Sequence, residues 1–208
     1  SRQICCRQGD RGRQHYPLQM LNLLADVLHG KKPQIPDRET WSAVFDALKF
    51  HAVWALPALS PERFLTDRKD QINLLTTAAS IVNTFYRLMD VQKEVLSVLE
   101  ASGVECVVIK GAASAMSYPK PEYRQMGDID LLVKPDQFEK AFSALSDAGY
   151  KTDESPENFV KHISFHSSEG IDIELHQYFS SSIEYAHNPY FDELLYEAIP
   201  KREITDIS

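Results

Sequence analysis

The chain has 208 residues, of which 43% are hydrophobic and 25% charged, a balance that is ordinary for a soluble globular protein. Its formal net charge of −8 argues against a broad interface with nucleic-acid phosphates, because proteins that bind nucleic acid usually carry a basic patch. Its apolar runs are shorter than the roughly 20 residues of a membrane span, and no signal-peptide pattern opens the sequence. Its three cysteines follow neither a disulfide nor a zinc pattern, so we expect a cytoplasmic protein.

The first half of the chain predicts helices. Residues 1–14 hold four arginines and few apolar side chains, so we expect a disordered arm or a cloning remnant there. Apolar residues recur at helical spacing from Leu18 to Leu28 and again from Trp41 to Leu48. Residues 62–101 contain no Gly or Pro, which predicts one long helix or two abutting helices. The apolar stripe of this third stretch comprises Ile72, Leu75, Ala79, Val82, Leu88, Val91, Val95 and Leu99. We therefore assign residues 15–102 to a helical N-terminal part.

The pattern changes after residue 103. A short β-branched run at residues 104–109 predicts a buried strand, which ends at Lys110 and Gly111 before the small, helix-permissive residues 112–116. A strand, a glycine turn and a helix N-terminus leave backbone N–H groups free for a phosphate, and Lys110 adds a positive charge there. Taken alone, a plain turn with a solvated lysine explains this segment equally well.

Two carboxylates stand two positions apart in the run of residues 127–133. Alternate residues of a strand share a face, so Asp128 and Asp130 are predicted to point the same way, with Ile129 and Leu131 facing a core. The two acids repel each other, which favours a cation between them, and carboxylate oxygens are the ligands that Mg²⁺ and Mn²⁺ prefer. A glycine just before the pair lets a substrate come close. A strand that carries two acids by chance is the alternative.

A β-hairpin is predicted from two alternating runs, residues 162–166 and 170–176. On the second run Asp172, Glu174 and His176 share the polar face, so this strand brings further acids and a histidine to the sheet. An exposed polar face is the alternative interpretation. Helices are expected to open near residue 135 and near residue 189, while His162 and His166 receive no role.

Together these segments resemble the nucleotidyltransferase superfamily of DNA polymerase beta and the aminoglycoside nucleotidyltransferases. That superfamily pairs a Gly-containing strand–helix turn with an Asp-hydrophobic-Asp strand and a third carboxylate on a later strand. More closely, the chain resembles the bacterial family called uncharacterised nucleotidyltransferases. The resemblance is carried by Ile109-Lys110-Gly111, Tyr118-Pro119, Arg124, residues 127–133 and Glu174-Leu175-His176. The chain departs from the superfamily pattern in having Lys110-Gly111-Ala112 where Gly-Ser is usual, and in the long gap that follows before Asp128.

The resemblance implies an α+β fold: a helical N-terminal part, then a small mixed β-sheet nucleotidyltransferase core with flanking helices at residues 103–208, with truncation at its C-terminus as an open alternative. It implies metal-dependent transfer of a nucleoside monophosphate to a hydroxyl. The catalytic residues, which would also hold Mg²⁺ or Mn²⁺, are expected to be Asp128, Asp130 and Glu174, with Asp172 in reserve as the third carboxylate. The expected nucleotide-binding residues are Lys110, Gly111, Arg124, Gly127 and His176.

The expected donor is a nucleoside triphosphate, ATP above all, and the expected acceptor is a small molecule or a protein. No extended nucleic acid and no membrane are expected as partners, because Lys110, Arg124 and Lys161 suffice for little more than one triphosphate. Two alternatives remain. A D-x-D glycosyltransferase would need a larger nucleotide-binding sheet before the motif. A catalytically silent module that binds a nucleotide or a partner would not need the intact acids.

Overall fold

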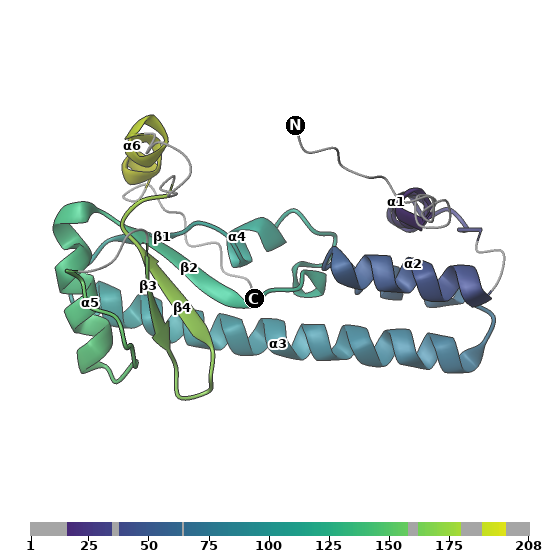
Figure 1. The fold of residues 1–208 in the computed structure, drawn as a ribbon, viewed down its shortest axis with the longest axis horizontal. Helices are drawn as coiled ribbons and strands as arrows, with labels where there is room; N and C mark the ends of the chain where they lie inside the picture. Colours follow the sequence, from purple (N-terminus) through teal and green to yellow (C-terminus); the bar gives the residue numbers. More distant parts are fainter. Residues whose placement is uncertain (1–15, 35–37, 64, 158–161, 180–188, 199–208) are drawn as a thin grey trace, which may run out of the picture. The chain divides into compact units, whose positions relative to one another are not determined.

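The structure is a computed structural model that describes residues 16–34, 38–63, 65–157, 162–179 and 189–198 (Figure 1). It contains two compact units, one formed by Ser1–Asn83 with Tyr118–Gln125 and the other by Thr84–Ser117 with Met126–Ser208. Helices come first and a small four-stranded mixed sheet follows, which confirms the expected α+β fold. The predicted arm at residues 1–14 lies outside the described residues, and the predicted division near residue 102 stays a prediction.

The first unit is helical. Its elements are α1 (Tyr16–Leu28), α2 (Arg38–Phe50), the short 3-10 helices η1 (Leu56–Leu59), η2 (Pro61–Arg63) and η3 (Pro121–Tyr123), and the beginning of α3 (Arg68–Ala101). Each long helix buries one stripe of apolar side chains in a common core, which removes their surface from water and stabilises the unit. The buried residues of these helices are Met20, Leu23, Val27, Trp41, Val44, Leu48, Leu74, Ala78 and Ile81.

One helix, α3, replaces the two abutting helices that residues 62–101 also allowed. Its inward stripe differs from the predicted one near its start, because Ile72 and Leu75 are exposed while Leu74 and Ala78 are buried. Apolar side chains stand on both sides of the helix here, so packing within the unit, and not periodicity, decides which stripe is buried. In its second half the predicted stripe is correct, and Leu88, Val91, Val95 and Leu99 are buried.

The second unit is built on a sheet with the strand order β1-β2-β4-β3 (Figure 1). The strands are β1 (Cys106–Val108), β2 (Asp128–Val133), β3 (His162–His166) and β4 (Asp172–His176). Strand β1 runs antiparallel to β2, β2 runs parallel to β4, and β3 and β4 form the predicted antiparallel hairpin. The helical elements are α4 (Ala112–Ala115), η4 (Pro135–Gln137), α5 (Phe138–Asp147) and α6 (Pro189–Ala198).

The two faces of the sheet differ in chemistry. On one face Ile129 and Leu131 of β2 lie in a single apolar core with Ile173 and Leu175 of β4 and with side chains of α5 and the later part of α3. The helical contribution to this core includes Val91, Val95, Leu99, Phe138, Ala141 and Leu145. Because successive strand residues alternate between faces, burial of these apolar positions places the intervening acids and histidines on the opposite face.

One smaller expectation is modified. The helix expected at residues 112–116 is a single turn of four residues, so it supplies little of the dipole that a long helix would offer a phosphate. Outside the named strands, Lys151 forms an isolated antiparallel β-bridge with His166. No helix in the described part of the chain combines the length and apolar character needed to cross a bilayer.

Candidate active site

Strand register aligns the polar residues of three strands into rows. The parallel pairing of β2 with β4 sets Asp130 opposite Glu174 and Leu132 opposite His176. The hairpin then sets His162 of β3 opposite His176. Opposite residues of paired strands lie on the same face with their Cβ atoms about 5 Å apart, so short side chains can meet across them.

Three carboxylates gather on this face. Asp128, Asp130 and Glu174 each offer an oxygen, and these oxygens all lie within 4.8 Å of one another. The side chain of Asp130 is almost fully buried, whereas Asp128 and Glu174 are partly exposed. The structure therefore brings together the two motif acids and the predicted third one, with a route from solvent to two of them.

Asp172, the reserve candidate, has a different neighbour. Its Oδ1 lies 2.7 Å from Nδ1 of His166, and both side chains are more than half exposed. Within the described residues, Glu174 and not Asp172 joins the two motif acids in a group that could hold an ion.

Lys110 contacts the acid group directly. Its Nζ donates to Oδ1 of Asp130 at 2.5 Å. Lys110 is followed by Gly111, whose φ of +49° would strain any residue with a side chain. A Cβ added at Gly111 would lie 3.5 Å from the backbone oxygen of Asp128, so the turn passes close to that strand. The backbone N–H of Ile109 also donates to the Asp130 carbonyl oxygen. The Lys110-Gly111 turn thus lies against the start of β2, next to the acids, where a phosphate bound by the turn would meet them.

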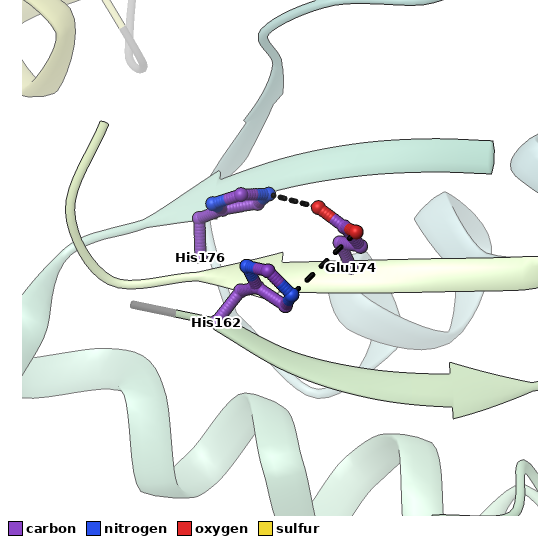
Figure 2. Close-up of side chains that lie close together, drawn as sticks. All are labelled: His162, Glu174 and His176. Carbon is purple, nitrogen blue, oxygen red and sulfur yellow. Dashed lines mark hydrogen bonds and ion pairs between the residues drawn. The ribbon is translucent and has the colours of Figure 1, made fainter. Parts of the chain in front are cut away.

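His176 links two of the acids. It is fully buried, and its Nε2 lies 3.1 Å from Oδ1 of Asp130 and 3.1 Å from Oε2 of Glu174. Figure 2 shows Glu174 beside the neighbouring rings of His176 and His162 and in contact with both; Nε2 of His162 lies 3.5 Å from the other oxygen of Glu174. A ring nitrogen between two carboxylates fixes both of them and offsets part of their mutual repulsion.

The two motif acids have opposite pKa shifts. Burial raises the pKa of Asp128, and the charges of Asp130 and Glu174 raise it further against a lowering by Lys110. Burial would also raise the pKa of Asp130, but its hydrogen bonds with His176 and Lys110 and their charges outweigh that effect and lower the pKa to about 2. Asp130 is therefore compensated by the protein, whereas Asp128 still faces uncompensated negative charge.

This donor set fits a hard divalent cation. Three carboxylate oxygens in one group match the preference of Mg²⁺ and Mn²⁺ for oxygen ligands. The raised pKa of Asp128 gives a second reason, since a bound cation would relieve the repulsion that causes it. The identity of the ion and the roles of the three acids stay predictions.

The other predicted nucleotide-binding residues are placed as follows. At Gly127, no atom of the described residues other than its chain neighbours lies within 4 Å of where a Cβ would stand, so a larger residue would fit there. Arg124 belongs to the first unit, where its guanidinium donates to the carbonyl oxygen of Gln125 at 3.4 Å. Lys161 lies outside the described residues.

His162 is the residue of this group to which the sequence interpretation gave no role. The signal was present in the predicted hairpin. Once His166 is placed opposite Asp172 by the short loop, antiparallel register also places His162 opposite His176.

Comparison with known proteins identifies one family. The family model described as "Uncharacterised nucleotidyltransferase" matches residues 37–207, well over half of the chain and including every strand of the sheet. Neither the curated proteins nor the solved structures provide a match.

Proposed function

From its membership of the uncharacterised nucleotidyltransferase family, we propose that this chain moves a nucleoside monophosphate group from a nucleoside triphosphate to a hydroxyl. The observation that carries the proposal is the group of Asp128, Asp130 and Glu174, assembled from two parallel neighbouring strands. ATP is the proposed donor, and a small molecule or a protein side chain is the proposed acceptor.

Asp128, Asp130 and Glu174 would hold Mg²⁺ or Mn²⁺. When bound, divalent ions stabilise the negative charge that develops on the attacking and leaving oxygens of a phosphoryl transfer. Glu174 has a second proposed task, to accept the proton of the attacking hydroxyl, because its side chain is partly open to solvent. His176 would act as a positioning residue, holding Asp130 and Glu174 in place through its Nε2.

The nucleotide would be bound from the same side. The ammonium of Lys110, already among the acids, would neutralise phosphate oxygens. For Arg124, which belongs to the first unit, a bidentate phosphate contact stays a prediction from the sequence alone. Gly111 and Gly127 would keep side chains away from the phosphates. The acceptor class follows from charge, since a polynucleotide acceptor needs a track of basic residues and the chain carries a net charge of −8.

The direct test is transfer of label from ATP carrying a radioactive α-phosphate, in the presence of Mg²⁺, to a panel of metabolites, proteins and total RNA. We expect label on a metabolite or a protein, together with pyrophosphate release, and loss of both in Asp128→Asn. The matched control is Asp172→Asn, which makes the same chemical change in an acid paired with His166. Release that is unchanged in Asp128→Asn would remove the proposed role, and strong labelling of RNA would overturn the acceptor class.

One observation favours a second candidate, a module that binds a nucleotide without transferring it. The Lys110 ammonium forms an ion pair with Asp130, so a cation of the protein itself balances part of the negative charge of the site. Calorimetric titration with ATP separates the candidates: a silent module binds ATP equally well with and without Mg²⁺ and releases no pyrophosphate. A glycosyltransferase would instead show a higher melting temperature with a UDP-sugar than with ATP.

A further inference from the structure

A second group of metal-ligating side chains lies on the same face of the sheet. His162 of β3, with Glu174 and His176 of β4, offers two imidazole nitrogens and a carboxylate oxygen, all within 4.8 Å of one another (Figure 2). It differs from the three-acid group in having nitrogen donors, and it shares Glu174 with that group.

The spacing of these donors already suits a single ion. His162 Nε2 lies 3.5 Å from one oxygen of Glu174, and His176 Nε2 lies 3.1 Å from the other. Ligand atoms that surround a tetrahedral Zn²⁺ at about 2.0–2.2 Å stand about 3.3–3.6 Å from one another. Rotation of the Glu174 carboxylate and the two rings, whose ligand atoms already lie within 4.8 Å of one another, would turn these contacts into ligation of one ion.

The three donors differ in burial: one is held rigidly in the interior, and the other two can be reached from solvent. His176 is fully buried, whereas the side chains of His162 and Glu174 are 29% and 23% exposed. An ion could therefore reach the group from the exposed side and keep a position open there, as catalytic zinc sites do.

Donor chemistry identifies the class of ion. Imidazole nitrogen suits Zn²⁺ and its neighbours in the first transition row, whereas Mg²⁺ takes oxygen ligands. We propose that His162, Glu174 and His176 form a binding site for a divalent transition ion of the Zn²⁺ class, distinct from the Mg²⁺ role proposed for the three acids. The site goes beyond the proposed function, because it requires no nucleotide and no transfer.

The surroundings of His176 also bear on how tightly the ion is held. Its Nε2, which contacts Asp130 and Glu174, would have to present its lone pair to the ion, leaving the proton on Nδ1. Nδ1 is buried, and in the described part of the chain it has no hydrogen-bond partner. Metal-binding histidines normally donate from the other nitrogen, and loss of that support weakens binding by about 10–100-fold, so we expect moderate affinity.

The test uses the full chain, titrated with Zn²⁺ by calorimetry and with Co²⁺ by visible absorption, in a large excess of Mg²⁺. We expect one ion to bind per chain and Mg²⁺ not to displace it. The Co²⁺ absorption bands should be those of four- or five-coordinate Co²⁺ with nitrogen and oxygen ligands. In His162→Ala the affinity for Zn²⁺ should fall at least about 100-fold, since a direct ligand is lost, whereas loss of outer support alone costs less. His162 is partly exposed, so the variant should fold, which circular dichroism checks.

Two controls make the result decisive. His166→Ala removes a histidine from the same strand, one paired with the exposed Asp172, and should leave Zn²⁺ binding unchanged. Asp128→Asn should also leave it unchanged, because Asp128 belongs only to the acid group. Undiminished binding in His162→Ala, or an equal loss in His166→Ala, would overturn the site. Loss of Zn²⁺ binding in Asp128→Asn alone would show that Zn²⁺ binds the three acids, which would overturn the histidine site and leave the nucleotidyltransferase proposal intact.

Discussion

The polar face of the sheet carries two pairs of a histidine with an aspartate, one at each end of β4, and they differ sharply in surroundings. His166 and Asp172 meet at 2.7 Å with 52% and 58% of their side chains exposed, whereas His176 and Asp130 meet at 3.1 Å with 0% and 2% exposed. All four residues stand at alternating polar positions of β2, β3 or β4, so strand alternation alone does not distinguish the two pairs. Burial separates them: water screens the first pair, while the second shares its space with Glu174 and Lys110.

The largest expected effect is on activity, at the buried pair. Asp130→Asn should lower nucleotide-dependent pyrophosphate release by at least about 100-fold, since it removes a preorganised charge from the proposed site. The same change at the exposed pair, Asp172→Asn, should alter the rate by less than about twofold. Equal losses in the two variants, measured under identical Mg²⁺ and ATP, would show that burial does not distinguish the pairs.

The next effect is on stability. His176→Ala should lower the free energy of unfolding by about 1–3 kcal/mol, because Asp130 and Glu174 lose a buried hydrogen-bonding partner. His166→Ala should change it by less than about 0.5 kcal/mol, as is usual for exposed positions. Urea unfolding of both variants beside the wild type measures the difference, and a larger loss in His166→Ala would reverse our interpretation of the two ends.

The pH dependence of stability should report on the buried pair. The pKa of Asp130 is lowered from 3.8 to about 2 in the folded protein, so the stability it contributes is fully present above pH 3.8 and is lost as the pH falls toward 2. At neutral pH this contribution is on the order of 2 kcal/mol. Unfolding measured from pH 7 down to pH 2 should therefore show the free energies of unfolding of the wild type and Asp130→Asn converging. A difference in the free energy of unfolding between the wild type and Asp130→Asn that stays constant with pH would contradict the lowered pKa of Asp130.

The smallest expected effect has the opposite sign. The pKa of Asp128 is raised, so its ionised form costs stability above that raised pKa, and the cost disappears when the group is protonated. Asp128→Asn should thus raise the free energy of unfolding at pH 7, by less than about 1 kcal/mol because solvent screens this partly exposed group. Adding Mg²⁺ should favour the wild type again, since it retains all three acids. A variant that is less stable than the wild type without Mg²⁺ would argue against uncompensated charge at Asp128.

The strands and helices of the second unit were largely predictable from local pattern, but their arrangement was not. Period-two alternation predicted β2 and the hairpin, and the loop at residues 167–170 fixed which residues of β3 and β4 stand opposite each other. No local signal predicts that β2 lies parallel to β4, because that pairing joins segments far apart in sequence. Similarly, periodicity predicted α3 but not its inward stripe near Ile72, where apolar residues stand on both sides.

The candidate site was predictable where the chemistry was concentrated in a motif. Asp128, Asp130 and Glu174 were identified from spacing and resemblance, and the structure brings their oxygens together. The sequence left open whether Glu174 or Asp172 is the third carboxylate, since both lie on one face of β4. In the structure Glu174 lies with Asp128 and Asp130, whereas Asp172 contacts His166. The contact of Lys110 with Asp130 could not be predicted, because it depends on how the turn after β1 folds back toward β2.

The hydrogen bond between His176 and Asp130 joins residues 46 positions apart in the chain, and this separation bears on the kinetics of folding. Contacts between distant residues must first overcome the entropy of closing a long loop, so they tend to form late. The two aspartates of β2 are synthesised well before β4, and the complete donor set exists only once those strands pair. If that pairing follows the rate-limiting barrier, an ion that binds the acids acts on the final stage of folding. It should then slow unfolding while leaving the refolding rate nearly unchanged.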